Sequence, residues 1–343
     1  MTNTTWKPSG FKLSRRGALA AAGAAALAAW PIHRVHAIDK VVLRTNWLFY
    51  GSHAVFFHGI DKGLYDQNGL DVVVKQGNGS GNTVRLVANK DSTFAYVSCA
   101  ALIKLAAQEA PIISVATIDG TGTEAVLVRP DSGIKTFKDL EGKQVLTTAG
   151  AGVNTFFPIA AQGAGVDVSR IELVNVAESA LVSSYLQNMA PAMLGGIDDK
   201  PAEITANGGE QPIVFNYADY GVHQPGYCIA THKDLVKENP DLVKRFVHGT
   251  IAAVKASAAD PEAAVQSLVN WKASAGDEKE LAQAREVLAV TLSILTSSNN
   301  KEKRIGLNVE ADWSSALELL KKYSELKTDM TADQFFTNEF LPA

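Results

Sequence analysis

The sequence predicts an α/β protein of two lobes, and three observations support this fold class. The chain has 343 residues, which at about 150 residues per domain corresponds to two domains. Short β-branched and apolar runs alternate with segments of helical periodicity, which indicates mostly parallel sheets with helices on both faces. From Asp234 onward the pattern is helical only, so we expect a helical tail that packs back on the first lobe.

The first residues are typical of a bacterial export signal. Arg15 and Arg16 form a twin-arginine start, residues 17–30 form an apolar run, and Ala37 ends a small-x-small cleavage pattern. An apolar run of about 14 residues is shorter than the roughly 20 that a membrane-spanning helix needs. We therefore expect cleavage after Ala37 and a free periplasmic protein that begins at Ile38.

The first lobe is predicted to comprise residues 38–128 and 228–343. Its expected strands cover residues 41–44, 70–74, 93–97, 112–118 and 125–128, with helices near 52–65, 83–89 and 100–109. Its helical tail is expected from residue 235, with helices over 261–271, 278–291 and 310–323. The chain is expected to leave this lobe near residues 127–129 and to return near 226–231.

The second lobe is predicted to comprise residues 129–227. Strands are expected at 144–148, 171–176, 192–194 and 212–215, and helices at 136–140, 154–162, 180–189 and 201–206. Gly or Pro residues flank both crossings between the lobes, as a hinge would require.

Composition excludes several function classes. A formal net charge of -4 argues against nucleic acid as a partner, because phosphate binding needs a concentrated basic surface. The two cysteines, Cys99 and Cys228, exclude a disulfide-rich scaffold and a four-cysteine metal site. They are expected to be buried thiols, with a disulfide left open. We expect no cofactor, no metal and no membrane-spanning segment in the mature chain.

Three segments carry a family resemblance. They are Asn46-Trp47 with Tyr50, His53, Lys62-Gly63-Leu64-Tyr65 and Gly69-Leu70-Asp71-Val72; the run from Thr136 to Lys143; and Asn239-Pro240-Asp241-Leu242-Val243. Together they resemble the periplasmic solute-binding proteins of the NMT1/THI5-like group, which also includes sulfonate- and nitrate-binding members, over about residues 38–255. The pyrimidine-binding branch often has Asp before the Trp, where this chain has Asn46.

The resemblance implies a type II periplasmic binding protein fold, in which two lobes close on a ligand like a hinged clamp. It also implies an ABC importer, with its permease and ATPase subunits as partners, and a protein that acts as a monomer. In such sheets the ligand lies at the carboxyl ends of the strands, so the strand-to-helix loops are the candidate site.

The loop after the first strand holds the aromatic candidates. Trp47 and Tyr50 offer faces on which a flat ring can stack, and Asn46 and His53 offer hydrogen-bonding groups beside them. The alternative is that the two aromatic residues belong to the core and His53 to helix packing. Ser98 follows a later strand and is a candidate for capping a helix and contacting the ligand.

The remaining candidates belong to the second lobe and its return crossing. Gly150, Gly152, Asn154 and Thr155 precede a helix whose free N–H groups can bind an anion or a carbonyl, or merely cap a turn. Asp198 follows a strand and can fix a ring amine, the alternative being a solvated acid. Tyr220 and Tyr227 lie near the return crossing and complete the set.

Two classes of function remain at this point. The favoured one is capture of a small organic solute, a pyrimidine-type thiamine precursor or related flat heterocycle, with an aromatic carboxylate, sulfonate or nitrate as the alternative ligand. The other is a pyrimidine synthase on the same fold. Those enzymes carry a cysteine-rich iron motif, where this chain has Gly150-Ala151-Gly152-Val153-Asn154, so we expect a protein that is not an enzyme.

Overall fold

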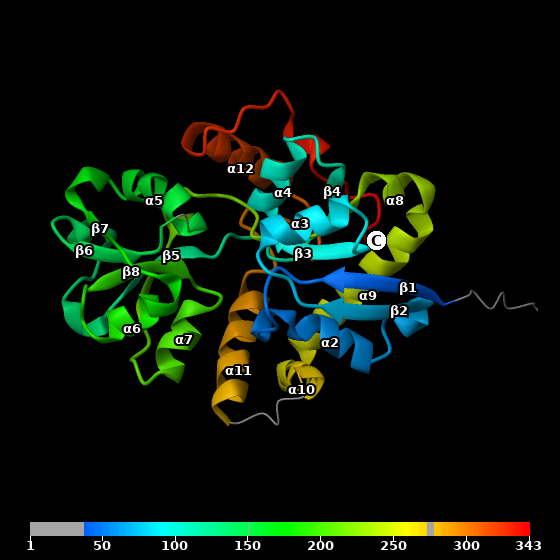
Figure 1. The fold of residues 1–343 in the computed structure, drawn as a ribbon, viewed down its shortest axis with the longest axis horizontal. Helices are drawn as coiled ribbons and strands as arrows, with labels where there is room; N and C mark the ends of the chain where they lie inside the picture. Colours follow the sequence, from blue (N-terminus) through cyan, green and yellow to red (C-terminus); the bar gives the residue numbers. More distant parts are fainter. Residues whose placement is uncertain (1–37, 150, 273–277) are drawn as a thin grey trace, which may run out of the picture. The chain divides into compact units, whose positions relative to one another are not determined.

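The computed structural model describes residues 38–149, 151–272 and 278–343, and the expected export signal lies outside them. Residues Ile38–Ala343 form one compact unit. Its described residues contain two five-stranded sheets, each with its own helices (Figure 1). The α/β class predicted from the sequence is confirmed.

The first sheet has the strand order β2-β1-β3-β10-β4. Its strands are β1 (Asp39–Arg44), β2 (Leu70–Lys75), β3 (Phe94–Ser98), β4 (Ile112–Thr117) and β10 (Tyr227–His232). β1 runs parallel to β2 and β3, whereas β10 runs antiparallel to both β3 and β4. Because β3 and β4 therefore share one direction, β10 is the reversed strand of this sheet.

The second sheet has the strand order β7-β6-β8-β5-β9. Its strands are β5 (Glu124–Val128), β6 (Gln144–Thr147), β7 (Glu172–Asn175), β8 (Ala192–Gly196) and β9 (Ile213–Asn216). β6 is parallel to β7 and β8, and β5 is antiparallel to β8 and β9. The prediction of mostly parallel sheets holds, with one reversed strand in each.

The outgoing crossing between the sheets differs from the expectation by one strand, and the return crossing by one residue. The sequence analysis placed residues 125–128 in the first lobe, but β5 pairs with β8 and β9 of the second sheet. Conversely, Tyr227 was placed in the second lobe and begins β10 of the first sheet. A short apolar strand carries no mark of the sheet with which it pairs, so hydrophobicity alone did not reveal this exchange.

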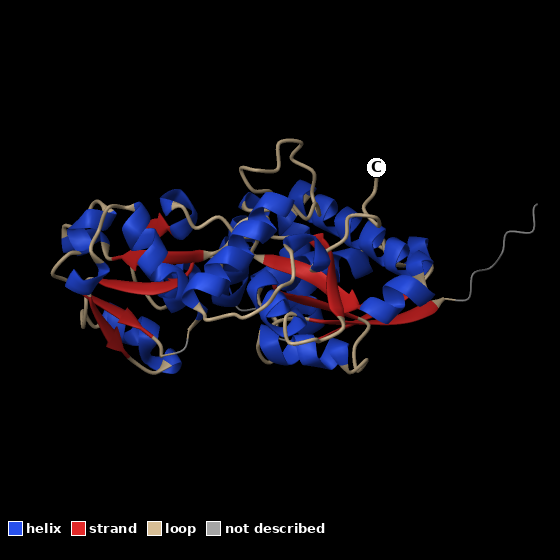
Figure 2. Ribbon diagram, turned by 90° about the horizontal axis from the view of Figure 1, so that it is seen from above, coloured by secondary structure: helices blue, strands red, loops and turns tan. Residues whose placement is uncertain are grey.

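Helices cover both faces of the sheets (Figure 2). Those of the first sheet and the adjoining chain are α2 (Ala54–Asp61), α3 (Ser80–Ala88) and α4 (Cys99–Ala106), and those of the second are α5 (Gly152–Gly163), α6 (Leu181–Leu186) and α7 (Lys200–Ala206). The tail contains α8 (Lys233–Glu238), α9 (Pro240–Ala259), α10 (Pro261–Lys272), α11 (Glu278–Ser293) and α12 (Glu310–Tyr323). Among the described residues, no helix is both long and apolar enough to cross a membrane.

The tail helices complete the core of the first sheet. Phe246 of α9 stacks on Phe94 of β3, with ring centroids 3.9 Å apart. The ring of Tyr65 also stacks on Phe246, with centroids 5.7 Å apart. These side chains are buried, and burying one such aromatic or aliphatic side chain contributes about 1.5–3 kcal/mol. The helical tail therefore packs on the first sheet, as predicted.

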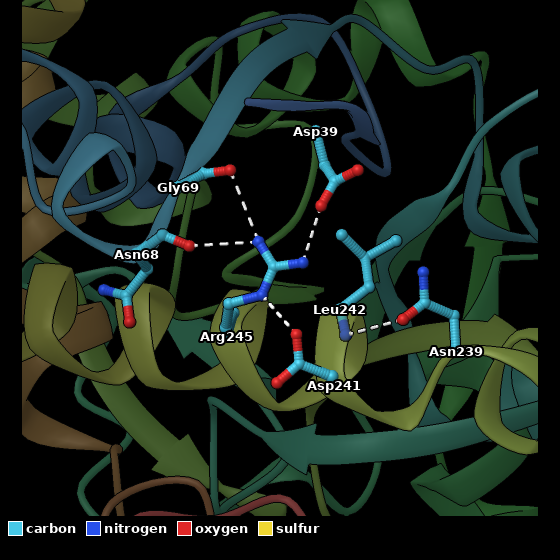
Figure 3. A network of polar contacts seen from close by, with 7 residues as sticks. All are labelled: Asp39, Asn68, Gly69, Asn239, Asp241, Leu242 and Arg245. Atoms are coloured by element: carbon cyan, nitrogen blue, oxygen red, sulfur yellow. Dashed lines mark hydrogen bonds and ion pairs between the residues drawn. The ribbon is translucent and has the colours of Figure 1, made fainter. Parts of the chain in front are cut away.

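Arg245 ties this tail to the start of β1 (Figure 3). Its guanidinium donates hydrogen bonds to the Asp39 carboxylate at 2.6 Å and to the Asp241 carboxylate at 2.7 Å. It also donates to the backbone carbonyls of Asn68 and Gly69 at 3.1 and 3.3 Å, just before β2. One side chain on α9 thus joins the first turn of that helix to two neighbouring strands.

We expect Arg245→Ala to lower the free energy of unfolding by about 1–3 kcal/mol, because it leaves the half-buried acceptors on Asp39, Asn68 and Gly69 without a charged donor. Urea denaturation measures the change. Arg285→Ala is the matched control: Arg285 pairs with Glu262 and Glu278 on an exposed surface, where such pairs contribute at most about 1 kcal/mol. Equal effects of the two substitutions would contradict the structural role given to Arg245.

Candidate functional site

The loop after β1 supplies the first polar group of the site. Asn46 is buried, and its Oδ1 lies 2.7 Å from Nε2 of His53, which is fully buried. The other ring nitrogen, Nδ1, accepts the backbone N–H of Tyr50 at 3.4 Å, so Nε2 carries the proton and donates to Asn46. Asn46 Nδ2 in turn donates to the Tyr50 hydroxyl at 3.4 Å. Both nitrogens of His53 are engaged by protein, which gives this residue a positioning role rather than the expected ligand contact.

Burial keeps His53 neutral. Desolvation lowers its pKa to about 3, because the charged imidazolium would lose its hydration inside the protein. A neutral imidazole offers no positive charge to an anionic ligand.

Two aromatic residues and a carboxyl group adjoin this loop at the ends of the neighbouring strands. Tyr96 of β3 donates its hydroxyl hydrogen bond to Oδ2 of Asp119 at 2.7 Å, and both residues are buried. The ring of Tyr227 of β10 stacks on Tyr96, with centroids 5.0 Å apart and planes 22° from parallel. The ring of His53 meets the edge of Tyr96 at 5.7 Å.

The second sheet contributes carboxyl groups to the same place. Asp198 follows β8 and is buried, and its carboxyl interacts with the side chains of Tyr50 and Thr123. Glu124, the first residue of β5, hydrogen-bonds with Gln224 and feels the charge of Asp198. Tyr50 and Asp198 thus join the loop after β1 to the loop after β8. We call Asn46, Tyr50, Tyr96, Asp119, Glu124, Asp198 and Tyr227 the inter-sheet cluster.

The position of this cluster follows from the sheet topology. Asn46, Asp119 and Asp198 each lie just beyond the carboxyl end of a strand, and Tyr227 and Glu124 begin the two reversed strands. The start of a reversed strand lies beside the carboxyl ends of its neighbours. Both sheets therefore present loops of the kind in which α/β proteins bind ligands.

Burial favours the protonated forms of the acidic groups in the inter-sheet cluster. Burial, with a smaller contribution from the charge of the nearby Asp198, raises the pKa of Asp119 to about 8. Burial also raises the pKa of Glu124 and of Asp198. Desolvation, followed by the charges of Tyr50, Asp198, Asp119 and Asp199, raises the pKa of Tyr227. The raised pKa values mean that adding negative charge to any of these groups costs free energy.

Lys200, at the start of α7, is committed to other carboxylates. Its ammonium lies 3.0 Å from both Glu178 and Glu203 and 3.3 Å from Asp199. Burial raises the pKa of Asp199 to about 7, with the charge of Asp198 adding to that shift. Three acidic partners around one amine leave little positive charge for an anionic ligand.

Trp47 projects from the β1 loop into solvent. Its side chain is 50% exposed, next to Leu48 at 57%, while its backbone carbonyl accepts hydrogen bonds from Thr45 Oγ1 and the N–H of Gly77. Trp47 is therefore not a core residue, which was the alternative to a ligand contact. Whether it binds ligand stays a prediction.

Ser98 lies beside the inter-sheet cluster at the end of β3, opposite Tyr227 in the strand pairing. Its N–H donates to the hydroxyl of Ser80 at 3.0 Å, and its own hydroxyl forms no cap on α4. The Ser98 hydroxyl therefore remains a candidate ligand contact.

The turn between β6 and α5 is held by its own side chains. Asn154 accepts a short hydrogen bond from the Thr147 hydroxyl and donates to the carbonyl of Thr148 at 2.9 Å. Gly152 is exposed as the first residue of α5, Thr155 is half-buried one turn later, and Gly150 lies outside the described residues. Asn154 thus stabilises the turn, and ligand binding by Gly152 and Thr155 stays a prediction.

Tyr220 packs away from the inter-sheet cluster. Its ring lies 4.8 Å from that of Phe137, against a hydrophobic core to which both sheets contribute. The structure therefore gives Tyr220 a core contact, whereas Tyr227, predicted beside it, stacks within the cluster.

The two cysteines are buried free thiols that hydrogen-bond to one another. Cys228 of β10 is opposite Val97, two residues before Cys99, which places both side chains on one face of the pairing. Burial raises the pKa of the Cys99 thiol well above its usual range, so the thiol is unreactive in the folded protein.

Comparison with protein families shows the family to which this chain belongs. The family described as NMT1/THI5 like matches residues 51–264. This chain belongs to the NMT1/THI5-like family. The matched region contains the inter-sheet cluster except for Asn46 and Tyr50, which lie immediately before it.

Similar proteins of this family bear different names. The chain is 23% identical to the riboflavin-binding protein RibY of Chloroflexus aurantiacus, over 89% of this chain and 87% of the relative. It is 22% identical to a formylaminopyrimidine-binding protein of Halalkalibacterium halodurans, over 88% and 91%. It is also 22% identical to a 4-amino-5-hydroxymethyl-2-methylpyrimidine phosphate synthase of Legionella pneumophila, over 89% and 93%.

Solved structures show the same fold. The periplasmic aliphatic sulphonate-binding protein SsuA of Escherichia coli matches with a TM-score of 0.67 and 13% identity, over 89% of this chain and 94% of that one. The periplasmic binding protein fold predicted from the resemblance is therefore confirmed for this member of the NMT1/THI5-like family.

The sequence analysis missed Tyr96, Asp119 and Glu124. Tyr96 lies inside an apolar strand, where an aromatic residue is typical of a core. Asp119 was the detectable one, because it directly follows a buried strand and precedes Gly120, in the position where α/β sheets place ligand-binding residues.

Proposed function

We propose that this protein is the solute-binding component of an ABC importer and that it captures a flat nitrogen heterocycle of pyrimidine type. The observation that carries the proposal is the inter-sheet cluster, in which aromatic and carboxyl side chains of both sheets meet at Tyr50 and Asp198. Aromatic side chains favour a flat ring, and carboxyl groups favour its N–H donors. Two relatives are named for binding riboflavin and a formylaminopyrimidine, both of which contain a pyrimidine ring.

An anionic ligand is disfavoured by the charges of the cluster. A sulfonate or nitrate requires a positive group or several free N–H donors. His53 is neutral, Lys200 is paired with three acids, and Asp119, Asp198 and Glu124 offer an anion no positive charge. The sulphonate-binding neighbour supports the fold of this chain and not its ligand.

The two-lobe division and its closure belong to this proposal. Contacts between the halves already exist, since Thr205 of α7 donates to Glu286 of α11 at 2.9 Å, and Tyr50 interacts with Asp198. A ligand that contacts both sides favours the closed arrangement by its differential affinity. The proposed function also includes export through the twin-arginine signal and cleavage after Ala37. It further includes a monomeric state and partnership with a permease and an ATPase.

The proposal is tested by titrating purified protein with 4-amino-5-hydroxymethyl-2-methylpyrimidine, riboflavin, nicotinate, an alkanesulfonate and nitrate. We expect a pyrimidine-containing compound to raise the melting temperature, since ligand at 100 times its Kd stabilises a protein by about 2.7 kcal/mol. The same compound should reduce the radius of gyration in small-angle scattering. If only the sulfonate or nitrate stabilised the protein, the proposal that its ligand is a heterocycle would be wrong.

The competing function is that of a pyrimidine synthase, because the Legionella relative is named as one. We infer a protein that is not an enzyme, because the riboflavin- and formylaminopyrimidine-binding relatives and the structural neighbour are binding proteins. Stoichiometric iron in the purified protein, together with pyrimidine formation, would overturn this inference.

A further inference from the structure

Asp119 is held in place by both crossings between the sheets. Its N–H donates to the carbonyl of Tyr227 at 3.0 Å, and its own carbonyl accepts the N–H of Gly226 at 2.8 Å. It stands where the chain leaves the first sheet, and Gly226 and Tyr227 stand where the chain returns. The backbone of Asp119 therefore joins the two segments by which the chain crosses between the sheets.

One carboxyl oxygen of Asp119 has a partner and the other does not. Oδ2 accepts the hydroxyl hydrogen bond of Tyr96, whereas Oδ1 has no hydrogen-bond partner among the described residues. The residue is only 1% exposed. A buried acceptor without a partner destabilises the free protein, so a ligand donor that reaches Oδ1 satisfies it on binding.

The groups around Asp119 select the kind of donor. Tyr96 and Tyr227 stack beside it and Tyr50 lies close enough to feel its charge, so the neighbours of this carboxyl group include three aromatic side chains. Asp198 faces it from the second sheet. A flat ring with an amino group or a protonated nitrogen matches both the aromatic neighbours and the carboxyl acceptor, whereas a carboxylate or sulfonate on that ring supplies no donor for Oδ1.

We propose that Asp119 is the specificity-determining residue of this protein and that its Oδ1 accepts a hydrogen bond from an N–H group of the bound heterocycle. This inference rests on the proposed function and adds the group that distinguishes one heterocycle from another. It assigns the selectivity to the crossing between the sheets, so a ligand that engages Asp119 touches the segment that has to bend when the halves close.

The test compares two probes that differ in one amino group: 4-amino-5-hydroxymethyl-2-methylpyrimidine and the same compound without its 4-amino group. Calorimetry should show that the wild-type protein binds the amino compound at least about tenfold more tightly, equivalent to about 1.4 kcal/mol. In Asp119→Ala the ratio of the two affinities should fall to about one, because the acceptor is gone. Asp119→Asn, which keeps the volume, should show an intermediate ratio.

Asp139→Asn is the control, since Asp139 caps an exposed turn in the second half of the molecule. It should leave the ratio at its wild-type value. Circular dichroism and melting curves establish that each variant is folded, and the isosteric Asn variant provides the readout if Asp119→Ala does not fold. An unchanged ratio in folded Asp119→Ala or Asp119→Asn overturns this inference alone. Failure of the wild-type protein to bind either pyrimidine overturns the proposed function, and this inference with it.

Discussion

Trp47→Ala should weaken binding of the pyrimidine ligand by about ten- to a hundredfold and leave the melting temperature of the free protein unchanged. Stacking of a base-like ring on an aromatic side chain contributes about 1–3 kcal/mol, and each factor of ten in affinity corresponds to about 1.4 kcal/mol. The indole is 50% exposed beside Asn46 and Tyr50, so its removal creates no core cavity. Calorimetric titration and a melting curve measure the two effects separately.

Trp271→Ala is the matched control for this prediction. Trp271 is 51% exposed, almost as much as Trp47, but it belongs to α10, where it packs on Phe57 and donates to Asp61 of α2, outside the inter-sheet cluster. It should leave the affinity unchanged. If Trp47→Ala preserves the affinity and lowers only the stability, the stacking role of Trp47 is wrong.

The second large effect concerns the pH dependence of stability through Asp119. Its pKa is raised to about 8, first by burial and then by Asp198, whereas the pKa of an aspartate in the unfolded chain is about 3.9. The folded state therefore holds a proton that the unfolded state releases, and this stabilises the folded state fully only below about pH 4. The contribution is lost progressively as the pH rises from about 4 to about 8.

Asp119→Asn removes this titration and keeps an acceptor for Tyr96. Measured by urea denaturation at pH 5, 7 and 9, the variant should gain stability relative to the wild type at each step, by a total of several kcal/mol at most. Asp139→Asn should show a constant difference across that range, because backbone hydrogen bonds from Lys135 and Thr136 lower the pKa of Asp139. If the free energies of unfolding of the wild type and of Asp119→Asn changed in parallel with pH, Asp119 would already be ionised in the folded protein.

This pKa also bears on ligand recognition. A carboxyl group with a pKa of about 8 is one unit from ionisation at pH 7, and one unit corresponds to about 1.4 kcal/mol. The hydrogen bond from a cationic or amino-bearing ring compensates that cost. Asp119 can therefore be neutral in the free protein and ionised in the complex, and ligand binding would release a proton.

The fold was predictable from the sequence because its elements are specified locally. The helix predicted over 310–323 coincides with α12, and the strand predicted over 41–44 lies within β1, because periodicity and β-branched runs record which face of an element is buried. The loop after β1 was predictable as a site for the same reason: a polar, aromatic stretch directly follows an apolar strand.

What only the tertiary structure decided is which residues meet. Asn46 and Tyr50 adjoin Asp119 and Tyr227 because β10 inserts, reversed, between β3 and β4, and Asp198 reaches Tyr50 from a different sheet. Likewise, the sequence contains no sign that both nitrogens of His53 are engaged, or that Tyr220 packs on Phe137 while Tyr227 joins the cluster. The sequence by itself determined the elements and the family, since these depend on neighbours in the chain. The composition and charge of the cluster depend on contacts between residues up to about 180 positions apart, and those exist only once both sheets have formed.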